Sequence, residues 1–369
     1  MKHKGTKVNF NIDHIDPLGQ GVSRDGKAVT FIAGTLPGET GKAVIYKKSK
    51  GVQFARLESL ASTADNRCEP KCPHFAQCPG CHYLHTDYRS ELAYKSKALA
   101  RHLTHLKIEQ DSIEVVPAPR REGYRNRVQL HYRHKYIGML DSVSNQIVEI
   151  PHCQILRPEL LAAFEKLYED RSWMQNNTGH GHCELYVKDG EVSQRWNQSY
   201  AHGGFSQVNS EMNDELQSRV QAQLHEVSAG SLLDLFSGRG NLSQKFVEQG
   251  GKRVMVDSYW GEQKEEQPEN FAKLDLFDDD ALKLFSRRWK KYSFDTVLVD
   301  PPRRGFPQLE NWVNRIKPQH LLYVSCNPAS LARDLGSLTK KYQMETVQLL
   351  DMFPSTYHFE TLVHLRFRQ

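Results

Sequence analysis

The sequence predicts a multidomain α/β protein built from three parts. Residues 204–369 alternate apolar, strand-like runs with helix-like stretches, the pattern of an open and largely parallel sheet covered by helices. Residues 1–61 contain short strand-like runs separated by turns, as expected of a small β-barrel. A cysteine-rich segment and a strand-rich region lie between them. A chain of 369 residues is long enough for each part to bury its own core.

The first part reads as a basic barrel. Its strand-like runs are VNFNI, KAVTFIAG, GKAVIYKK and FARLESL, and its turns are marked by Gly19-Gln20-Gly21, Asp25-Gly26 and Pro37-Gly38. Residues 1–60 hold ten Lys and Arg against five Asp and Glu, which accounts for the whole formal net charge of +5. This excess suggests contact with a polyanion such as RNA. A structural or dimerising barrel would have the same strand pattern.

The cysteines indicate a metal site. Seven cysteines occur in a chain whose N-terminus lacks the apolar core of a signal peptide and which has no apolar run of membrane-spanning length. We therefore expect a cytoplasmic protein that contacts no membrane, in which metal binding or catalysis is a better use for cysteine than disulfides.

Cys72, Cys78 and Cys81 follow the spacing C-x5-C-x2-C. An iron–sulfur cluster can take three cysteines from one loop and a fourth from a distant segment, whereas zinc usually prefers paired hooks. Cys153 is the candidate for the fourth ligand. The spacing leaves open zinc as the metal, and it leaves open other ligands, namely Cys68, Cys183, His74 and His82.

The middle of the chain begins with a helix predicted over residues 84–107 and continues with strands from about 113 to 200. Basic and aromatic residues alternate there and could grip phosphates and stack on bases. They are Arg120, Arg121, Arg125, Arg127, Arg133, His134, Tyr124, Tyr132 and Tyr136. An ordinary exposed sheet face would look much the same.

In the last part, functional residues fall at the ends of predicted strands, where open parallel sheets bind ligands. The turn DLFSGRGN, residues 234–241, lacks the third glycine of the dinucleotide fingerprint. A glycine turn followed by Asp257 at the end of the next strand fits S-adenosylmethionine better, since Gly238 and Gly240 allow the backbone to approach a cofactor. Asp300-Pro301-Pro302-Arg303 lacks the aromatic residue typical of exocyclic-amine methyltransferases.

Cys326 lies between the apolar run LLYVS and a predicted helix. Asn327 suits the N-cap of that helix and Pro328 its first position. The helix dipole beside Cys326 is expected to favour a thiolate, which attacks carbon electrophiles. For a lone cysteine a buried, unreactive side chain is the usual alternative.

The assembled motifs resemble the RNA uracil-5-methyltransferase family, in particular its members that have a TRAM barrel and an iron–sulfur cluster and that methylate 23S rRNA. The motifs are C-x5-C-x2-C, GGFSQVNSEMN, LLDLFSGRGN, VLVDPPRRG, YVSCNPASLARD and MFPSTYHFETLV. The resemblance implies a [4Fe-4S] cluster on Cys72, Cys78, Cys81 and Cys153. It implies Cys326 as the nucleophile and Glu360 as the general base.

The resemblance also assigns the cofactor and the domains. S-adenosylmethionine would contact Gln207, Phe236, Gly238, Gly240, Asn241, Asp257, Asp275 and Asp300. Asp275 is the loosest of these, because residues 257–275 are shorter and more polar than the family pattern. The implied domains are an OB-like TRAM barrel over 1–61, a central iron–sulfur and RNA-binding domain over 62–83 and 113–203, and a Rossmann-like class I methyltransferase domain over 84–112 and 204–369.

The chemistry supports the implied reaction. Thiolate addition to C6 of uracil makes C5 nucleophilic, and a base must remove the C5 proton after methyl transfer. With the resemblance, we expect a monomeric enzyme that methylates C5 of a uridine, and 23S rRNA is the expected substrate. The alternatives are a tRNA uracil-5-methyltransferase, a cytosine-C5 methyltransferase, and a catalytically weak RNA-binding homologue.

Overall fold

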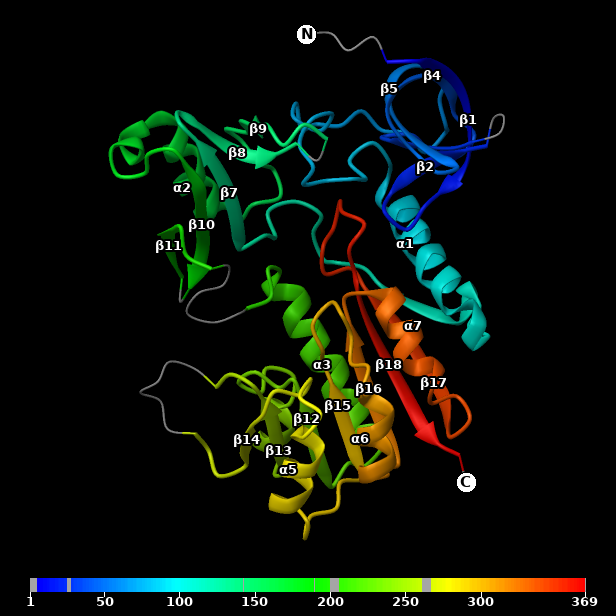
Figure 1. Cartoon of the computed structure of the whole chain (residues 1–369), viewed down its shortest axis with the longest axis vertical. Coiled ribbons are helices and arrows are strands. Elements are labelled where there is room, and N and C mark those ends of the chain that lie inside the picture. Colours follow the sequence, from blue (N-terminus) through cyan, green and yellow to red (C-terminus); the bar gives the residue numbers. More distant parts are fainter. Residues whose placement is uncertain are drawn as a thin grey trace. The chain divides into compact units, whose positions relative to one another are not determined.

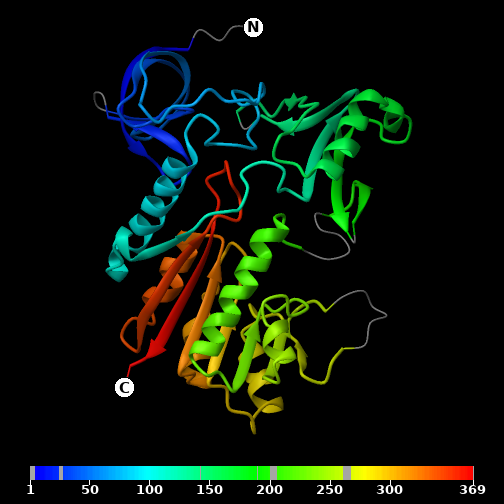
Figure 2. The same ribbon diagram turned by 180° about the vertical axis from the view of Figure 1, so that it is seen from behind.

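The computed structural model describes residues 5–24, 28–141, 143–188, 190–199, 206–260 and 267–368. The predicted turn at Asp25-Gly26 and the start of the motif GGFSQVNSEMN lie outside these residues. The chain divides into two compact units (Figures 1 and 2). The first consists of Met1–Ala98, Arg120–His202 and Phe353–Tyr357, and the second of Leu99–Pro119, Gly203–Met352 and His358–Gln369.

The first unit begins with a closed five-stranded barrel in the order β1-β2-β3-β5-β4. Its strands are β1 (Lys7–Ile15), β2 (Gln20–Ser23), β3 (Val29–Ala33), β4 (Thr40–Ser49) and β5 (Val52–Ser62). Alternate residues such as Phe10, Ile12 and Ile32 fill its interior. The α/β class and the N-terminal barrel are therefore confirmed, although β2 occupies residues that were predicted as part of a turn. The turn is shorter, because the Asp16 carboxylate accepts hydrogen bonds from the N–H groups of Leu18 and Gln20.

The first unit also contains an antiparallel sheet in the order β11-β10-β7-β8-β9. Its strands are β7 (Arg127–Arg133), β8 (Tyr136–Leu140), β9 (Ile147–Val148), β10 (His180–Lys188) and β11 (Glu191–Trp196). Helix α2 (Pro158–Glu169) and the 3₁₀ helix η3 (Arg171–Gln175), which were not predicted, lie between β9 and β10 in the sequence. Leu160 and Phe164 of α2 are fully buried in the core of this sheet.

Several of the basic and aromatic residues predicted to grip RNA are used inside the first unit. Arg127 is 4% exposed and pairs with Glu184 at 3.0 Å. Arg121 pairs with the buried Glu91, and Tyr124 and Tyr132 are buried. Arg127, Tyr124 and Tyr132 therefore do not belong to an exposed sheet face, whereas Arg120, Arg133 and His134 are exposed. The Tyr136 side chain, at 46%, does remain exposed.

Helix α1 (Tyr88–Leu103) starts later than the predicted residue 84. The Asp87 carboxylate accepts hydrogen bonds from the N–H and hydroxyl of Ser90, so Asp87 caps the first turn. The helix passes into the 3₁₀ helix η1 (Thr104–Leu106), and Lys107 ends it in a left-handed conformation with φ 60°. The boundary between the units falls within α1, after Ala98, whereas residues 84–112 were predicted to belong to the last domain.

The second unit is built on an eight-stranded sheet in the order β14-β13-β12-β15-β16-β18-β17-β6. The strands are β6 (Ile113–Val116), β12 (Ser231–Leu235), β13 (Lys252–Asp257), β14 (Phe271–Lys273), β15 (Thr296–Val299), β16 (His320–Ser325), β17 (Tyr342–Leu350) and β18 (Glu360–Phe367). The pairs from β14 to β16 are parallel, and β18 runs antiparallel to both β16 and β17. Strand β6, predicted in the central domain, is an edge strand of this sheet beside β17.

Helices cover both faces of this sheet. Helix α3 (Ser210–Glu226) lies on one face (Figure 2). Helices α5 (Ala281–Arg288), α6 (Leu309–Ile316) and α7 (Pro328–Gly336) lie on the other (Figure 1). Helix α4 (Gln244–Glu248) is a short helix between β12 and β13. Phe285, Trp312 and Leu331 join the central strands in one buried core, which fixes the strand ends that carry the candidate site.

No helix in the described ranges has the length and apolar character needed to cross a membrane.

Candidate active site

Cys326 lies in the tight turn between β16 and α7. The Asn327 side chain caps α7 by accepting a hydrogen bond from the N–H of Ala329 at 3.1 Å, and Pro328 is the first helical residue, which confirms the predicted N-terminus. Asn327 Nδ2 and Ser330 Oγ donate to the carbonyl of Arg303, at 2.8 and 3.1 Å. The turn that carries Cys326 is therefore fastened to the loop that follows β15.

Glu360 is placed beside this turn by the strand register. Antiparallel pairing of β16 with β18 puts Ser325, the last residue of β16, opposite Thr361. The residue that follows β16 and the first residue of β18 therefore meet at the same end of the sheet. These residues are Cys326 and Glu360. Glu360 is 4% exposed, and it raises the pKa of the Cys326 thiol. The structure thus brings together the two residues predicted as nucleophile and base, which are 34 positions apart in the sequence.

Burial controls the ionisation of Cys326 and Glu360. Burial, reinforced by Glu360 and Asp300, raises the pKa of Cys326 to about 12, and Arg303 opposes the shift. Burial and Asp300 also raise the pKa of Glu360 well above its ordinary value. The expectation that the helix dipole favours a thiolate is therefore wrong for the free protein. Desolvation and two nearby carboxyl groups outweigh the dipole at the start of α7.

A cluster of carboxyl groups lies at the ends of β12, β13 and β15. Burial and the neighbouring Asp234 and Asp257 raise the pKa of Asp300 to about 7. Asp257 Oδ2 accepts a hydrogen bond from the N–H of Gly238 at 2.8 Å, which joins the end of β13 to the glycine turn. Gly238 has φ +51°, and a Cβ built there would meet no atom within 4 Å. The turn therefore presents open backbone beside a group of acids.

The other predicted cofactor residues differ in their surroundings. Phe236 has φ 59°, a strained conformation for a residue with a side chain, and its ring packs against Phe277 and Phe306 with centroids 5.4 and 4.9 Å away. Asn241 Oδ1 accepts a hydrogen bond from Gln217 Nε2 of α3 at 2.8 Å.

Two further predicted cofactor residues, Gln207 and Asp275, lie just before α3 and just after β14. Gln207 precedes Asn209, whose side chain caps α3. Asp275 is exposed, and it accepts a hydrogen bond from the N–H of Phe277 at 3.0 Å.

Sequence reasoning assigned no role in the site to three residues that shape it, Asp234, Arg253 and Arg303. Asp234 is buried, accepts a hydrogen bond from Ser243 Oγ and has a pKa raised by burial to about 7. Arg253 donates to Ser243 Oγ at 2.7 Å and so supports the same turn. Arg303 lowers the pKa of both Cys326 and Glu360. The one available signal was the position of Asp234 and Arg303 at strand ends.

The four predicted cluster ligands lie in the first unit. Burial raises the pKa of Cys78 to about 11, and burial also raises the pKa of Cys81 and Cys153. The charges of Cys153, Cys78 and Cys72 each raise the pKa of Cys81, so the four thiols are near one another. Within the described ranges, no three His, Cys, Asp or Glu side chains are arranged to hold a metal ion. The cluster therefore stays a prediction.

Comparison with known proteins finds RNA methyltransferases among the proteins similar to this chain. The model of the family "tRNA (Uracil-5-)-methyltransferase" matches residues 277–368, which include the turn of Cys326 and the strand of Glu360. The 23S rRNA (uracil(1939)-C(5))-methyltransferase RlmD of Erwinia tasmaniensis is 28% identical, with 96% of this chain and 95% of that protein covered. The protein of the same name from Pectobacterium atrosepticum is also 28% identical, over 96% of this chain and 92% of that one.

A solved structure has a similar fold. The tRNA (uracil-54, C5)-methyltransferase of Pyrococcus abyssi, in complex with S-adenosyl-L-homocysteine, superposes with a TM-score of 0.68. The match covers 97% of this chain and all of that one at 22% sequence identity. Together, these comparisons confirm the resemblance to RNA uracil-5-methyltransferases that the motifs of this sequence predicted.

Proposed function

We propose that this chain transfers a methyl group from S-adenosylmethionine to C5 of a uridine in RNA, with 23S rRNA as the substrate. The observation that carries this proposal is the meeting of Cys326 and Glu360 at the paired ends of β16 and β18. Asp300, at the end of β15, acts on both through its charge. A thiol and a carboxyl group in one buried place are the two groups that methylation of a pyrimidine ring carbon requires.

The acids at the ends of β12, β13 and β15 fit a cationic cofactor. Asp234 and Asp257 raise the pKa of Asp300, so a positive charge beside them would relieve their mutual repulsion. S-adenosylmethionine, when bound, supplies a methyl group on a sulfonium centre. Asp257 and the backbone of Gly238 would hold its ribose end, and Phe236 and Asp300 would line the remainder. Gln207, Gly240, Asn241 and Asp275 are further proposed contacts, and we assign Asp275 to the adenine.

Cys326 and Glu360 divide the chemistry between them. Cys326 Sγ adds to C6 of the uracil, and C5 then takes the methyl group as the bond between methyl carbon and sulfur breaks. Glu360 removes the proton from C5, and the electrons of that C–H bond restore the ring double bond while Cys326 leaves. The uracil must leave its base stack to reach the partly buried thiol.

Burial raises the pKa of Cys326 to about 12, so its thiol is protonated in the free protein at neutral pH, and burial also raises the pKa of Glu360. The attacking thiolate therefore has to form in the complex with substrate. Arg303 is the cation that already lowers both pKa values. We assign it the role of stabilising the negative charge that passes through this site during addition and elimination.

The barrel carries a surface suited to RNA, and we propose that it is a TRAM barrel. Phe31 and Phe54 are partners on β3 and β5, and their rings stack at 5.4 Å with an interplanar angle of 22°. Tyr46 of β4 lies 6.5 Å from Phe54 and is 41% exposed. Lys47 lies over Phe54 and Arg56 over Tyr46. Such a row offers bases a stacking surface and phosphates two cations.

We further propose that Cys72, Cys78, Cys81 and Cys153 hold a [4Fe-4S] cluster. The mutual effect of these thiols supports the proposal: the charges of Cys153, Cys78 and Cys72 each raise the pKa of Cys81, and a cationic iron–sulfur core would relieve that repulsion. The N–H of Gly80 also lies 3.4 Å from Cys78 Sγ, as a donor to a bound thiolate would. Methyl transfer needs no electrons, so the cluster would organise the RNA-binding unit. We also propose that the enzyme is cytoplasmic and monomeric and that it contacts no membrane.

A tRNA uridine is the second candidate substrate. The matching family model and the Pyrococcus abyssi structure both carry tRNA enzyme names, whereas the relatives that cover nearly the whole chain carry a 23S rRNA name. We favour 23S rRNA because the relatives with that name are 28% identical to this chain over 96% of its length, whereas the tRNA enzyme of known structure is 22% identical.

The test is mass mapping of 5-methyluridine in 23S rRNA and tRNA from cells that lack this protein. Complementation with the wild type and with Cys326→Ala runs alongside. We expect one 5-methyluridine of 23S rRNA to disappear and to return only with the wild type. Loss of a tRNA modification would transfer the activity to tRNA. Unchanged maps in both RNAs would refute the proposed activity and favour a binding-only protein.

The cluster is tested on protein purified without oxygen. Iron and sulfide should each be present at about four per chain, as the [4Fe-4S] formula requires, and Cys153→Ser should lower both. Zinc without sulfide would replace the cluster with a zinc site. Cys68→Ser is the matched control, because Cys68 is exposed and outside the proposed ligand set.

A further inference from the structure

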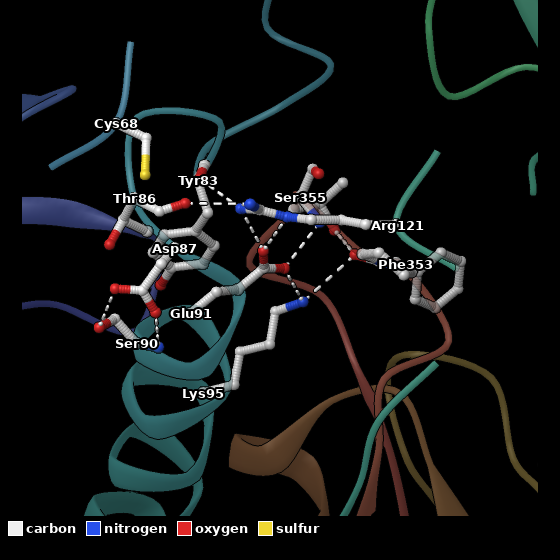
Figure 3. Close-up of polar contacts among 12 residues, drawn as sticks. Cys68, Tyr83, Thr86, Asp87, Ser90, Glu91, Lys95, Arg121, Phe353 and Ser355 are labelled. Carbon is white, nitrogen blue, oxygen red and sulfur yellow. Dashed lines mark hydrogen bonds and ion pairs between the residues drawn. The ribbon is translucent and has the colours of Figure 1, made fainter. Parts of the chain in front are cut away.

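A buried cluster of charges in the first unit, formed by Glu91, Lys95 and Arg121, is not explained by the proposed chemistry (Figure 3). The side chains of Glu91 and Lys95 are completely buried, and Lys95 Nζ lies 2.7 Å from Glu91 Oε1. Arg121 binds the other carboxylate oxygen, with Nε at 2.9 Å and Nη2 at 2.7 Å. Arg121 also donates to the carbonyls of Thr86 and Tyr83, at 3.0 and 2.6 Å.

This cluster holds the loop Phe353–Tyr357, which belongs to the same unit. The N–H of Ser355 donates to Glu91 Oε1 at 2.6 Å, and Lys95 Nζ donates to the carbonyl of Phe353 at 3.3 Å (Figure 3). The hydroxyl of Tyr124 donates to the carbonyl of Pro354 at 2.9 Å. The N–H groups of His82 and Tyr83 donate to the carbonyl of Ser355, at 2.7 and 3.0 Å. Three consecutive loop residues are thus bound through their backbones.

The loop conformation needs such support. Ser355 is fully buried and has φ 68°, a left-handed conformation that a residue with a side chain adopts at a cost. A buried, irregular backbone must also find partners for its polar groups. An apolar side chain could fill the same space but could not form hydrogen bonds with the backbone N–H and carbonyl groups of the loop. The need to bind these groups therefore explains why the residues here are charged.

We propose that Glu91, Lys95 and Arg121 are positioning residues for the general base Glu360. The chain runs from Tyr357 through His358 and Phe359 directly to Glu360, the first residue of β18. A loop fixed at Phe353, Pro354 and Ser355 restricts where β18 begins and therefore where its first carboxyl group lies. This inference rests on the proposed function, and it assigns the cluster to one step of that reaction.

The assigned step gives the cluster a specific signature. Glu360 acts only after Cys326 has added to C6 and C5 has been methylated. A displaced Glu360 would leave the C5 proton in place, so Cys326 could not leave and the methylated RNA would stay covalently attached. A general loss of structure would instead prevent the first addition and give no adduct.

The experiment compares Lys95→Met and Glu91→Gln with the wild type and with Lys97→Met. Lys95→Met removes the bonds to Glu91 and Phe353 but leaves Glu91 paired with Arg121, so it is the milder variant. Glu91→Gln removes the negative charge that Lys95 and Arg121 both bind and tests whether the effect grows. Lys97→Met removes an exposed lysine from the same helix and serves as the control.

The substrate is an RNA that the wild type methylates, with radiolabelled S-adenosylmethionine. Steady-state rates give kcat and KM, and denaturing gels show labelled RNA that is covalently bound to protein. We expect kcat of Lys95→Met to fall by about 10- to 100-fold with KM for RNA within about twofold of wild type, since small displacements of a catalytic group cost this much. The labelled adduct should accumulate in this variant and stay absent with Lys97→Met.

Wild-type kcat for Lys95→Met would overturn the inference, and so would a reduced kcat without adduct. A lower kcat for Glu91→Gln, again with adduct, would strengthen it. If the wild type methylates neither rRNA nor tRNA, the proposed function and this inference both fail. If the wild type is active and only the effects predicted for the variants are missing, this inference alone fails.

Discussion

Cys326 should react as an unactivated thiol in the free protein. Its pKa is raised from 9.0 to about 12 by burial and by the negative charges of Glu360 and Asp300. Each pKa unit is a factor of ten in the thiolate fraction, so about a thousandfold less thiolate is present at pH 8 than for an ordinary cysteine. Replacing Glu360 by glutamine removes one of the two negative charges and should lower this pKa, while burial keeps it above 9.

The assay is alkylation by iodoacetamide between pH 7 and pH 10, followed by mass spectrometry of the peptide that contains Cys326. Burial also hinders entry of the reagent, but it does so equally at every pH, and the pH dependence therefore carries the information. We expect the rate to rise about tenfold per pH unit across the range without a plateau. Cys326→Ser protein gives the background.

Glu360→Gln should react faster at every pH in this range, by roughly tenfold if the carboxylate accounts for one pKa unit. A plateau of the wild-type rate below pH 9 would refute the reasoning, because it would mean that a thiolate is already formed. An unchanged or slower rate for Glu360→Gln would refute the assigned electrostatic role of the carboxylate.

Three further predictions concern stability and RNA binding. Asp300→Asn should abolish methyl transfer but stabilise the second unit at pH 8 by up to about 4 kcal/mol, because a carboxyl whose pKa rises from 3.8 to about 7 on folding destabilises the protein as pH increases through that interval. Urea unfolding should show this gain shrink towards pH 4, and an equal gain at both pH values would contradict it. Arg127→Met should cost about 3–5 kcal/mol by removing the cation that pairs with the buried Glu184, and Arg127→Met with Glu184→Leu should recover most of it; equal unfolding midpoints for the single and double variants would refute this account. Phe54→Ala should weaken RNA binding by about 1–3 kcal/mol in a filter-binding titration while kcat at saturating RNA is kept, and unchanged affinity would remove the barrel row from the RNA contact.

The sequence alone identified the features that depend on local signals. The cap and first turn of α7 follow from Asn327 and Pro328, and these place Cys326 at a strand end. The alternation of strands and helices predicted the open sheet, and the runs before residue 61 predicted the barrel. Sequence motifs also carried the resemblance that the comparisons confirmed. Each of these signals is contained in a few neighbouring residues.

Tertiary structure decided what depends on distant partners. The strand order that places β18 between β16 and β17 brings Glu360 to Cys326, and no local pattern specifies that order. The pKa of Cys326 was predicted in the wrong direction because a helix dipole is local, whereas burial and the approach of Glu360 and Asp300 are not. Arg121 and Arg127 read as surface cations until their buried carboxylate partners, 30 and 57 residues away, were known. Charge and burial are properties of the assembled fold, and for that reason only the structure could assign them.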